Sequence, residues 1–164
     1  MVIHTLGSHQ LYIDRVPKDQ IVYTPNCQSQ SSVTCSEESL VNAFDNTVIS
    51  VDSFLSSVIE ELADKKALLV YTSDHGESLG EDGFFGHGKP IKIAPKEQFN
   101  VPLVFWFSEP YLQTETGQKV YSSFKKHTVN ASLSHDNVYH SILGCSGIAS
   151  TNGGIGKELN ICAQ

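Results

Sequence analysis

A long amphipathic helix that leads directly into a short apolar strand is the feature that most constrains how this chain folds. In residues 36–64 apolar side chains recur about every 3.6 residues, which predicts a helix with one face packed against a sheet. Ser36 is a favourable N-cap, and the Lys65–Lys66 pair suits the negative end of the helix dipole. Residues 67–72 (ALLVYT) form an uncharged, largely apolar run, which after a helix predicts a buried parallel strand.

The remaining sequence predicts two more strands and one more helix. Residues 101–107 (VPLVFWF) predict a strand whose proline lies near its start, and residues 2–6 predict a first strand. Residues 134–144 predict a final helix, whereas residues 108–133 and 147–164 are polar and weakly periodic, so we expect them to be mostly loops. The order strand, helix, strand, strand, helix predicts an α/β fold with a mostly parallel sheet and flanking helices.

Composition excludes several classes of protein. The 164 residues suffice for one domain, and 11 basic against 18 acidic residues give a net charge of −7 with no basic run, which argues against nucleic acid as a partner. No apolar stretch approaches the roughly 20 residues that span a bilayer. The chain opens inside a predicted strand with no sign of a signal peptide, so we expect it to be a fragment of a longer protein.

Four cysteines leave two pairing questions open. Cys27 and Cys35 bracket a short polar loop, CQSQSSVTC, with no other residue that completes a zinc site, so they are either a disulfide or two unrelated thiols. Cys145 and Cys162 flank a glycine-containing tail and present the same two alternatives. A bridge at either pair places the protein in an oxidising compartment.

Metal-ligating residue types gather where the predicted strands end. Asp74 and His75 follow the strand at 67–72, and His9 follows the predicted first strand, so all three are expected at one rim of the sheet. His87 lies between two glycines that allow its backbone to turn inward, and Gly76 allows a turn after His75. A helix-capping aspartate and surface histidines are the alternative reading. Imidazole nitrogens and a carboxylate favour Zn²⁺ over Mg²⁺ or Ca²⁺.

Several segments, taken together, resemble the C-terminal part of the phosphoethanolamine transferases, which belong to the alkaline phosphatase and sulfatase superfamily. The segments are HTLGSH (4–9), FDNTV (44–48), SDHGESLGEDGFFGHGKP (73–90), IAP (93–95), NVPLVFW (100–106) and SHDNVYHSILG (134–144). The resemblance implies a partial alkaline-phosphatase-like sandwich, with residues 1–164 as the C-terminal half of a sulfatase-like catalytic domain. It also implies a disulfide between Cys27 and Cys35, because the family's TPxC loop matches residues 24–27.

The resemblance assigns roles to the candidate ligands. Asp74 and His75 match ligands of the zinc ion that activates the nucleophile, and His9 and His87 match residues that hold a second zinc or the phosphate of the substrate. His4 matches a recurring position, as a substrate-binding or a structural residue. Ser73 and Glu77 match positions that orient ligands from the second shell.

The family's threonine nucleophile and an acidic zinc ligand precede the motif at 4–9, so neither is expected in this chain. Thr5, Thr24 and Thr72 do not stand in the family's nucleophile context, and we reject all three.

The resemblance implies a zinc-dependent enzyme on the periplasmic face of the bacterial inner membrane, anchored through an absent N-terminal region. Such an enzyme moves phosphoethanolamine from phosphatidylethanolamine to lipid A or another lipopolysaccharide sugar through a covalent threonine intermediate. The alternatives are a sulfatase-like or phosphodiesterase-like hydrolase of a soluble ester, and a non-catalytic metal-binding fragment. We expect the isolated fragment to be inactive and to self-associate, because half a sheet exposes strand edges and apolar surface.

Overall fold

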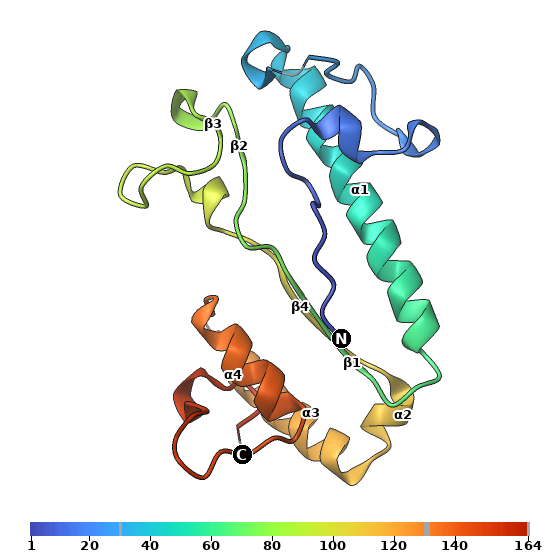
Figure 1. The fold of residues 1–164 in the computed structure, drawn as a ribbon, viewed down its shortest axis with the longest axis vertical. Coiled ribbons are helices and arrows are strands. Elements are labelled where there is room, and N and C mark those ends of the chain that lie inside the picture. Colours follow the sequence, from blue (N-terminus) through green and yellow to red (C-terminus); the bar gives the residue numbers. More distant parts are fainter. Residues whose placement is uncertain (30, 130–131, 164) are drawn as a thin grey trace. The chain divides into compact units, whose positions relative to one another are not determined.

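The computed structural model describes residues 1–29, 31–129 and 132–163, which divide into two compact units (Figure 1). The first unit comprises Met1–Val58 and Ser73–Pro102, and the second comprises Ile59–Thr72 and Leu103–Gln164. Every predicted metal-site residue falls in the first unit. Among the described residues, no helix is both long enough and apolar enough to cross a bilayer.

Helix α1 (Glu37–Leu62) confirms the helix predicted for residues 36–64. Its first turn is capped as expected, because Oγ of Ser36 accepts a hydrogen bond of 3.3 Å from the amide of Ser39. Only the first half of the helix contributes buried residues, among them the fully buried Asn46. The Asn46 side chain accepts from the amides of Val22 and Tyr23 at 2.8 and 2.9 Å and donates to the Tyr23 carbonyl. This amide therefore ties the segment before the Cys27–Cys35 loop to the helix.

The core of the first unit joins three segments that are far apart in the sequence. Tyr12, Cys27, Leu40 and Ala43 are its buried members, and Cys35, Phe44, Leu79 and Phe85 pack against them. Cys27 and Cys35 form a disulfide with their Cα atoms 5.8 Å apart, which confirms the pairing implied by the resemblance. The last two core residues belong to a hairpin of the short strands β2 (Ser78–Leu79) and β3 (Phe85–Gly86), which carries part of the candidate site.

In the second unit, β1 (Leu68–Thr72) lies beside β4 (Leu103–Phe107) (Figure 1). The two strands confirm the predicted strands at 67–72 and 101–107. The Ser108 side chain, directly after β4, binds the backbone directly before β1. Its Oγ accepts from the Ala67 amide at 3.0 Å and donates to the Lys65 carbonyl at 2.5 Å.

Helices α2 (Glu109–Leu112), α3 (Glu115–Thr128) and α4 (Asp136–Cys145) complete the second unit. Its core is formed by Val120, Cys145, Ile161 and Cys162, with Leu68, Phe105, Phe107, Tyr111, Phe124 and Leu133 packed against them. Cys145 and Cys162 form the second disulfide, which resolves the alternative left open by the sequence. Helix α4 confirms the helix predicted at residues 134–144.

Three sequence predictions are wrong in detail. Both ladders of the described residues are antiparallel, because an apolar run reports that a strand is buried and carries no information about its direction. Residues 2–6 form no strand and are exposed, and no strand of the described chain pairs with them. Residues 108–133, expected to be loops, contain α2 and α3, which are capped by the side chains of Ser108 and Thr114.

Candidate metal centre

The β2–β3 hairpin places Glu77 opposite His87. Ser78 pairs with Gly86 and Leu79 with Phe85 in an antiparallel register, so Glu77 and His87 form the next pair outward. His75 lies two residues before Glu77. The hairpin thus delivers one carboxylate and two imidazoles to a single position in the first unit.

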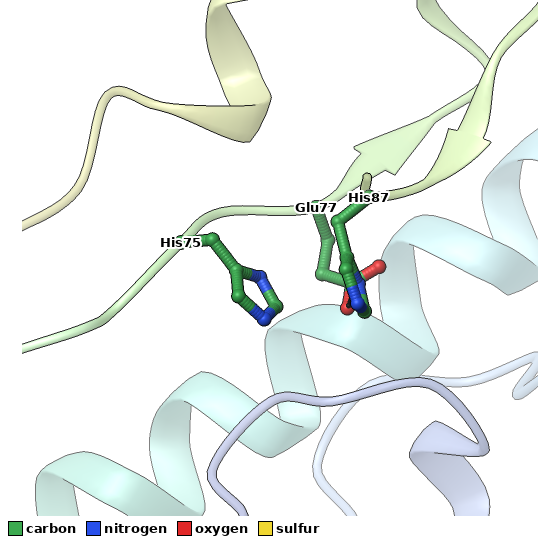
Figure 2. A group of neighbouring side chains, drawn as sticks. All are labelled: His75, Glu77 and His87. Carbon is green, nitrogen blue, oxygen red and sulfur yellow. Dashed lines mark hydrogen bonds and ion pairs between the residues drawn. The ribbon is translucent and has the colours of Figure 1, made fainter. Parts of the chain in front are cut away.

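The ligand atoms of His75, Glu77 and His87 all lie within 4.8 Å of one another. Figure 2 shows both imidazoles and the carboxylate directed toward the same space. The two imidazole rings are stacked, with centroids 3.9 Å apart and an interplanar angle of 28°. Two imidazole nitrogens and one carboxylate oxygen are the donor set of many three-residue zinc sites.

Hydrogen bonds orient both imidazoles of this group. Nδ1 of His87 lies 2.9 Å from Oε1 of Glu77, and Nδ1 of His75 lies 3.1 Å from the carbonyl of Gly76. Since a carbonyl and a carboxylate only accept, each Nδ1 carries the proton. The lone pair of each Nε2 is therefore available to a metal ion or to an acidic proton of a ligand.

The carboxylate of Glu77 is buried, with a side chain only 4% exposed. Tyr12 donates to its Oε2 at 3.4 Å, and burial, followed by the charge of Glu77, raises the pKa of Tyr12 so that the phenol keeps its proton. In the described part of the chain, the only side chain that can form an ion pair with Glu77 is His87. No lysine or arginine of those residues does so. A buried carboxylate is costly without a compensating positive charge, and a cation bound beside it supplies one.

His9 joins the group from a distant segment. Its ring centroid lies 5.2 Å from that of His87 and 6.3 Å from that of His75. Nδ1 of His9 is buried without a hydrogen-bond partner in the described residues. An unsatisfied buried nitrogen among three converging imidazoles fits a site that binds a cation or a phosphate.

Asp74 lies at the exposed edge of the group. Its side chain is 83% exposed, and its Oδ1 accepts from the His75 amide at 3.1 Å while lying 3.9 Å from Nε2 of His75. Asp74 lies near His75 but is not part of the group of ligand atoms that His75, Glu77 and His87 form, so its predicted role as a metal ligand stays a prediction.

Ser73 and His4 were also predicted to belong to the site, and the structure places only Ser73 next to a candidate ligand. Ser73 donates from Oγ to the His75 carbonyl at 2.7 Å, so it holds the backbone of a candidate ligand. His4 lies in the exposed segment before Leu6 and, among the described residues, is not part of the group of ligand atoms. Glu77, predicted to orient ligands from the second shell, contacts Nδ1 of His87 at 2.9 Å and also lies within 4.8 Å of the ligand atoms of His75 and His87.

Three glycines near the candidate site are required, for two different reasons. The Cβ of any residue replacing Gly76 falls 1.9 Å from the carbonyl oxygen of Glu97, and the Gly76 amide donates to the Gln98 carbonyl at 2.9 Å. Gly76 thus permits a close backbone approach, and its φ is not in the left-handed region. Gly86 and Gly88, on either side of His87, do have positive φ values of 75° and 91°.

A shallow depression of about 280 Å³ opens beside the two stacked imidazoles. It is lined by His75, His87, Gly88, Lys89, Ile91, Ala94, Gln98 and Phe99. The lining thus combines two imidazoles and a lysine, which can bind an anion or a cation, with apolar side chains.

Comparison with known proteins identifies what the chain is similar to. The sequence model of the family described as Sulfatase matches residues 1–148. Over 163 residues the chain is 38% identical to the Kdo(2)-lipid A phosphoethanolamine 7''-transferase of Escherichia coli K12, and the match covers 99% of this chain and 29% of that protein. The chain thus spans less than a third of the length of this relative.

Two solved structures are similar over 96% of the chain, each at 34% identity. The soluble domain of lipooligosaccharide phosphoethanolamine transferase A from Neisseria meningitidis superposes with a TM-score of 0.85, and 48% of that domain is covered. The C-terminal periplasmic domain of phosphoethanolamine transferase EptC from Campylobacter jejuni superposes with a TM-score of 0.81, and 49% of it is covered.

Proposed function

The chain belongs to the sulfatase family, and on that premise we propose that it is the C-terminal half of the catalytic domain of a phosphoethanolamine transferase. The observation that carries the proposal is the convergence of His9, His75, His87 and Glu77 on one point beside an open depression. The transferase names of the relatives and of the structural neighbours support the reaction class.

We propose that the ion held here is Zn²⁺, with His75, Glu77, His87 and Asp74 as its candidate ligands from this chain. The donor set of nitrogen and oxygen atoms fits zinc, and the buried Glu77 carboxylate gains the positive charge that it lacks. When bound, zinc would lower the pKa of an attacking hydroxyl and stabilise charge on a phosphoryl group. The threonine that supplies this hydroxyl in the family pattern is proposed to lie outside this chain.

The residues of this chain would position and neutralise the phosphoryl group. Because Glu77 and the Gly76 carbonyl fix the protons on the two Nδ1 atoms, both Nε2 atoms present a defined lone pair or proton to the ligand. His9 brings a third imidazole from another segment, and its unsatisfied Nδ1 would gain a partner when a phosphate oxygen enters. The group would thus bind an anion more tightly when its imidazoles are protonated.

The proposed substrates follow from the family resemblance and the relatives' names. The donor is phosphatidylethanolamine, and the acceptor is lipid A or another lipopolysaccharide sugar. One structural neighbour is a periplasmic domain, which supports a location on the periplasmic face of the inner membrane, with the membrane anchor outside the described chain. Two disulfides are in keeping with that oxidising compartment.

The test compares two substrates on the intact protein that contains this chain. Turnover of phosphatidylethanolamine with transfer to lipid A, and little hydrolysis of a soluble phosphate or sulfate ester, supports the transferase. The reverse preference assigns the protein to the hydrolases of the same superfamily. The isolated 164-residue chain is expected to be inactive in both assays, and its turnover of either substrate would contradict the proposed division of the active site.

A further inference from the structure

Residues 89–99, here called the 89–99 loop, have a composition that differs from the rest of the chain. Lys89, Lys92 and Lys96 outnumber the single acidic residue of the loop, Glu97, in a chain whose net charge is −7. Ile91 and Ile93 alternate with these lysines. Basic and apolar side chains therefore share one short segment of an otherwise acidic protein.

The apolar side chains of the loop are exposed to solvent. Ile91 is 73% exposed, Ile93 is 58% exposed and Phe99 is 46% exposed. Single exposed apolar residues are ordinary on protein surfaces, but these three lie within nine positions and form a patch, and Ile91 and Phe99 also line the depression. The three lysines are exposed as well.

Hydrogen bonds hold the loop in this exposed conformation. The amides of Ile93 and Ala94 both donate to the Pro90 carbonyl, at 2.9 and 3.0 Å. At the base, the buried Gln98 side chain accepts from the Lys89 amide at 3.2 Å and donates to Oγ of Ser78 at 2.9 Å. The loop is thus anchored to the hairpin of the candidate metal centre while its isoleucines face solvent.

The charges of the loop are available to a partner. In the described part of the chain, neither Lys92 nor Lys96 forms an ion pair. Lys89 lies over the ring of Phe84, with Nζ 4.8 Å from the centroid. A partner that carries negative charge above an apolar layer complements both features of the loop.

We infer that the 89–99 loop docks on the surface of a lipid bilayer that contains anionic headgroups. Isoleucine and phenylalanine side chains would enter the boundary between headgroups and acyl chains, and the lysine ammonium groups would lie at the phosphates. A protein partner is a poorer match, because lysine is depleted in protein–protein interfaces. The inference concerns docking alone and does not depend on the proposed reaction.

Docking at this loop has a consequence for the candidate metal centre. Ile91 and Phe99 line the same depression as His75 and His87. A bilayer that contacts the loop therefore lies next to the imidazoles. If the proposed function holds, the headgroup of a lipid reaches the centre while its acyl chains remain in the membrane.

The test is sedimentation of the 164-residue chain with vesicles of phosphatidylcholine alone, and with vesicles of equal parts phosphatidylcholine and phosphatidylglycerol. Binding is expected only to the anionic vesicles and should weaken as salt is added. The double variant Lys92→Gln/Lys96→Gln should bind about thirtyfold more weakly, since each lysine near an anionic surface contributes about 1 kcal/mol. The matched control Lys125→Gln/Lys126→Gln, on α3, should change binding less than about twofold.

A second variant tests the apolar part of the inference. Ile91→Asn/Ile93→Asn keeps all charges and should also lose most vesicle binding, with an unchanged circular dichroism spectrum and thermal midpoint. Equal binding to neutral and anionic vesicles, or equal losses in the α3 control and the loop variant, would overturn the inference. Self-association of the chain that disappears in the isoleucine variant, without any vesicle binding, would assign the loop to a protein contact and overturn it as well. No step uses zinc or turnover, so failure here is distinct from failure of the proposed function.

Discussion

Oε1 of Glu77 lies 2.9 Å from Nδ1 of His87, and the carboxylate that makes this contact is almost completely buried. The pair is formed by strand register, since Glu77 and His87 are opposite each other just outside the β2–β3 ladder. The contact fixes the proton on Nδ1 and leaves Nε2 free. Glu77 therefore both orients a candidate ligand and supplies negative charge to a candidate cation site.

Replacing Glu77 by glutamine should weaken zinc binding by about 10- to 100-fold, as loss of a carboxylate partner of a ligating histidine typically does. The amide keeps the size of the side chain but removes its charge. Zinc competition against a coloured chelator measures the change. Glu109→Gln, an exposed residue of α2, is the matched control and should leave zinc affinity unaltered. Equal affinity of the Glu77→Gln variant and the unmodified chain would remove Glu77 from the centre.

Replacing Gly76 by alanine should lower the free energy of unfolding by about 1–3 kcal/mol, the usual cost of an added methyl group in a tight contact. The new Cβ falls 1.9 Å from the Glu97 carbonyl oxygen, so the backbone of residues 97–98 must shift. Urea unfolding measures the loss. Gly154→Ala is the control, because the atom nearest to its new Cβ is the side-chain hydroxyl of Ser150 at 3.2 Å and not a backbone atom. Similar stability of the two variants would contradict the close backbone approach.

The Tyr111 phenol should make stability fall at alkaline pH. Burial raises the pKa of Tyr111 above its ordinary value of 10.0, and its hydroxyl donates to the Cys145 carbonyl at 2.7 Å. Because the folded-state pKa is the higher one, the contribution is complete below pH 10 and is lost as pH rises through the folded-state pKa. Urea midpoints from neutral to alkaline pH should therefore fall more steeply for the unmodified chain than for Tyr111→Phe. Parallel curves would show that this phenol has the same pKa in both states.

Exposed apolar side chains of α1 should drive self-association of the isolated chain. Val48, on the apolar stripe that was predicted to pack against a sheet, is 46% exposed, and Phe54, beside that stripe on the same helix, is 42% exposed. Phe54→Lys should reduce the oligomer fraction in sedimentation velocity experiments. Ser56→Lys adds the same charge on the same helix and should have little effect. A chain that remains monomeric at every accessible concentration would refute this prediction.

Local sequence patterns predicted the elements whose signal is contained in one segment. The helix at 36–64 and the strands at 67–72 and 101–107 are of this kind, because periodicity and length are properties of the segment itself. Strand direction was not predictable, since it depends on a partner strand 30 or so residues away. Helix α3 was missed because its sequence is mostly polar, although Thr114 is a recognisable N-cap.

The candidate site was also predicted only in part. Its histidines were expected to lie together, whereas the strand pairing that places Glu77 among them was not predicted. His9, His75 and His87 were expected together, and their rings lie within 6.3 Å of one another. The resemblance gave Glu77 a role in orienting ligands, but its position opposite His87 was not predicted, because that position depends on the register of a two-residue ladder. The sequence signal for this position is an antiparallel hairpin with its turn between Leu79 and Phe85, because such a hairpin places residue 77 opposite residue 87. The metal-binding roles of all these residues remain predictions.

The most direct measurement is anomalous X-ray diffraction at the zinc edge from crystals of the chain grown with zinc. The account predicts an anomalous peak within bonding distance, about 2.0–2.2 Å, of side-chain atoms of His75, Glu77 and His87. A zinc peak elsewhere, with these three side chains free of metal, would contradict it.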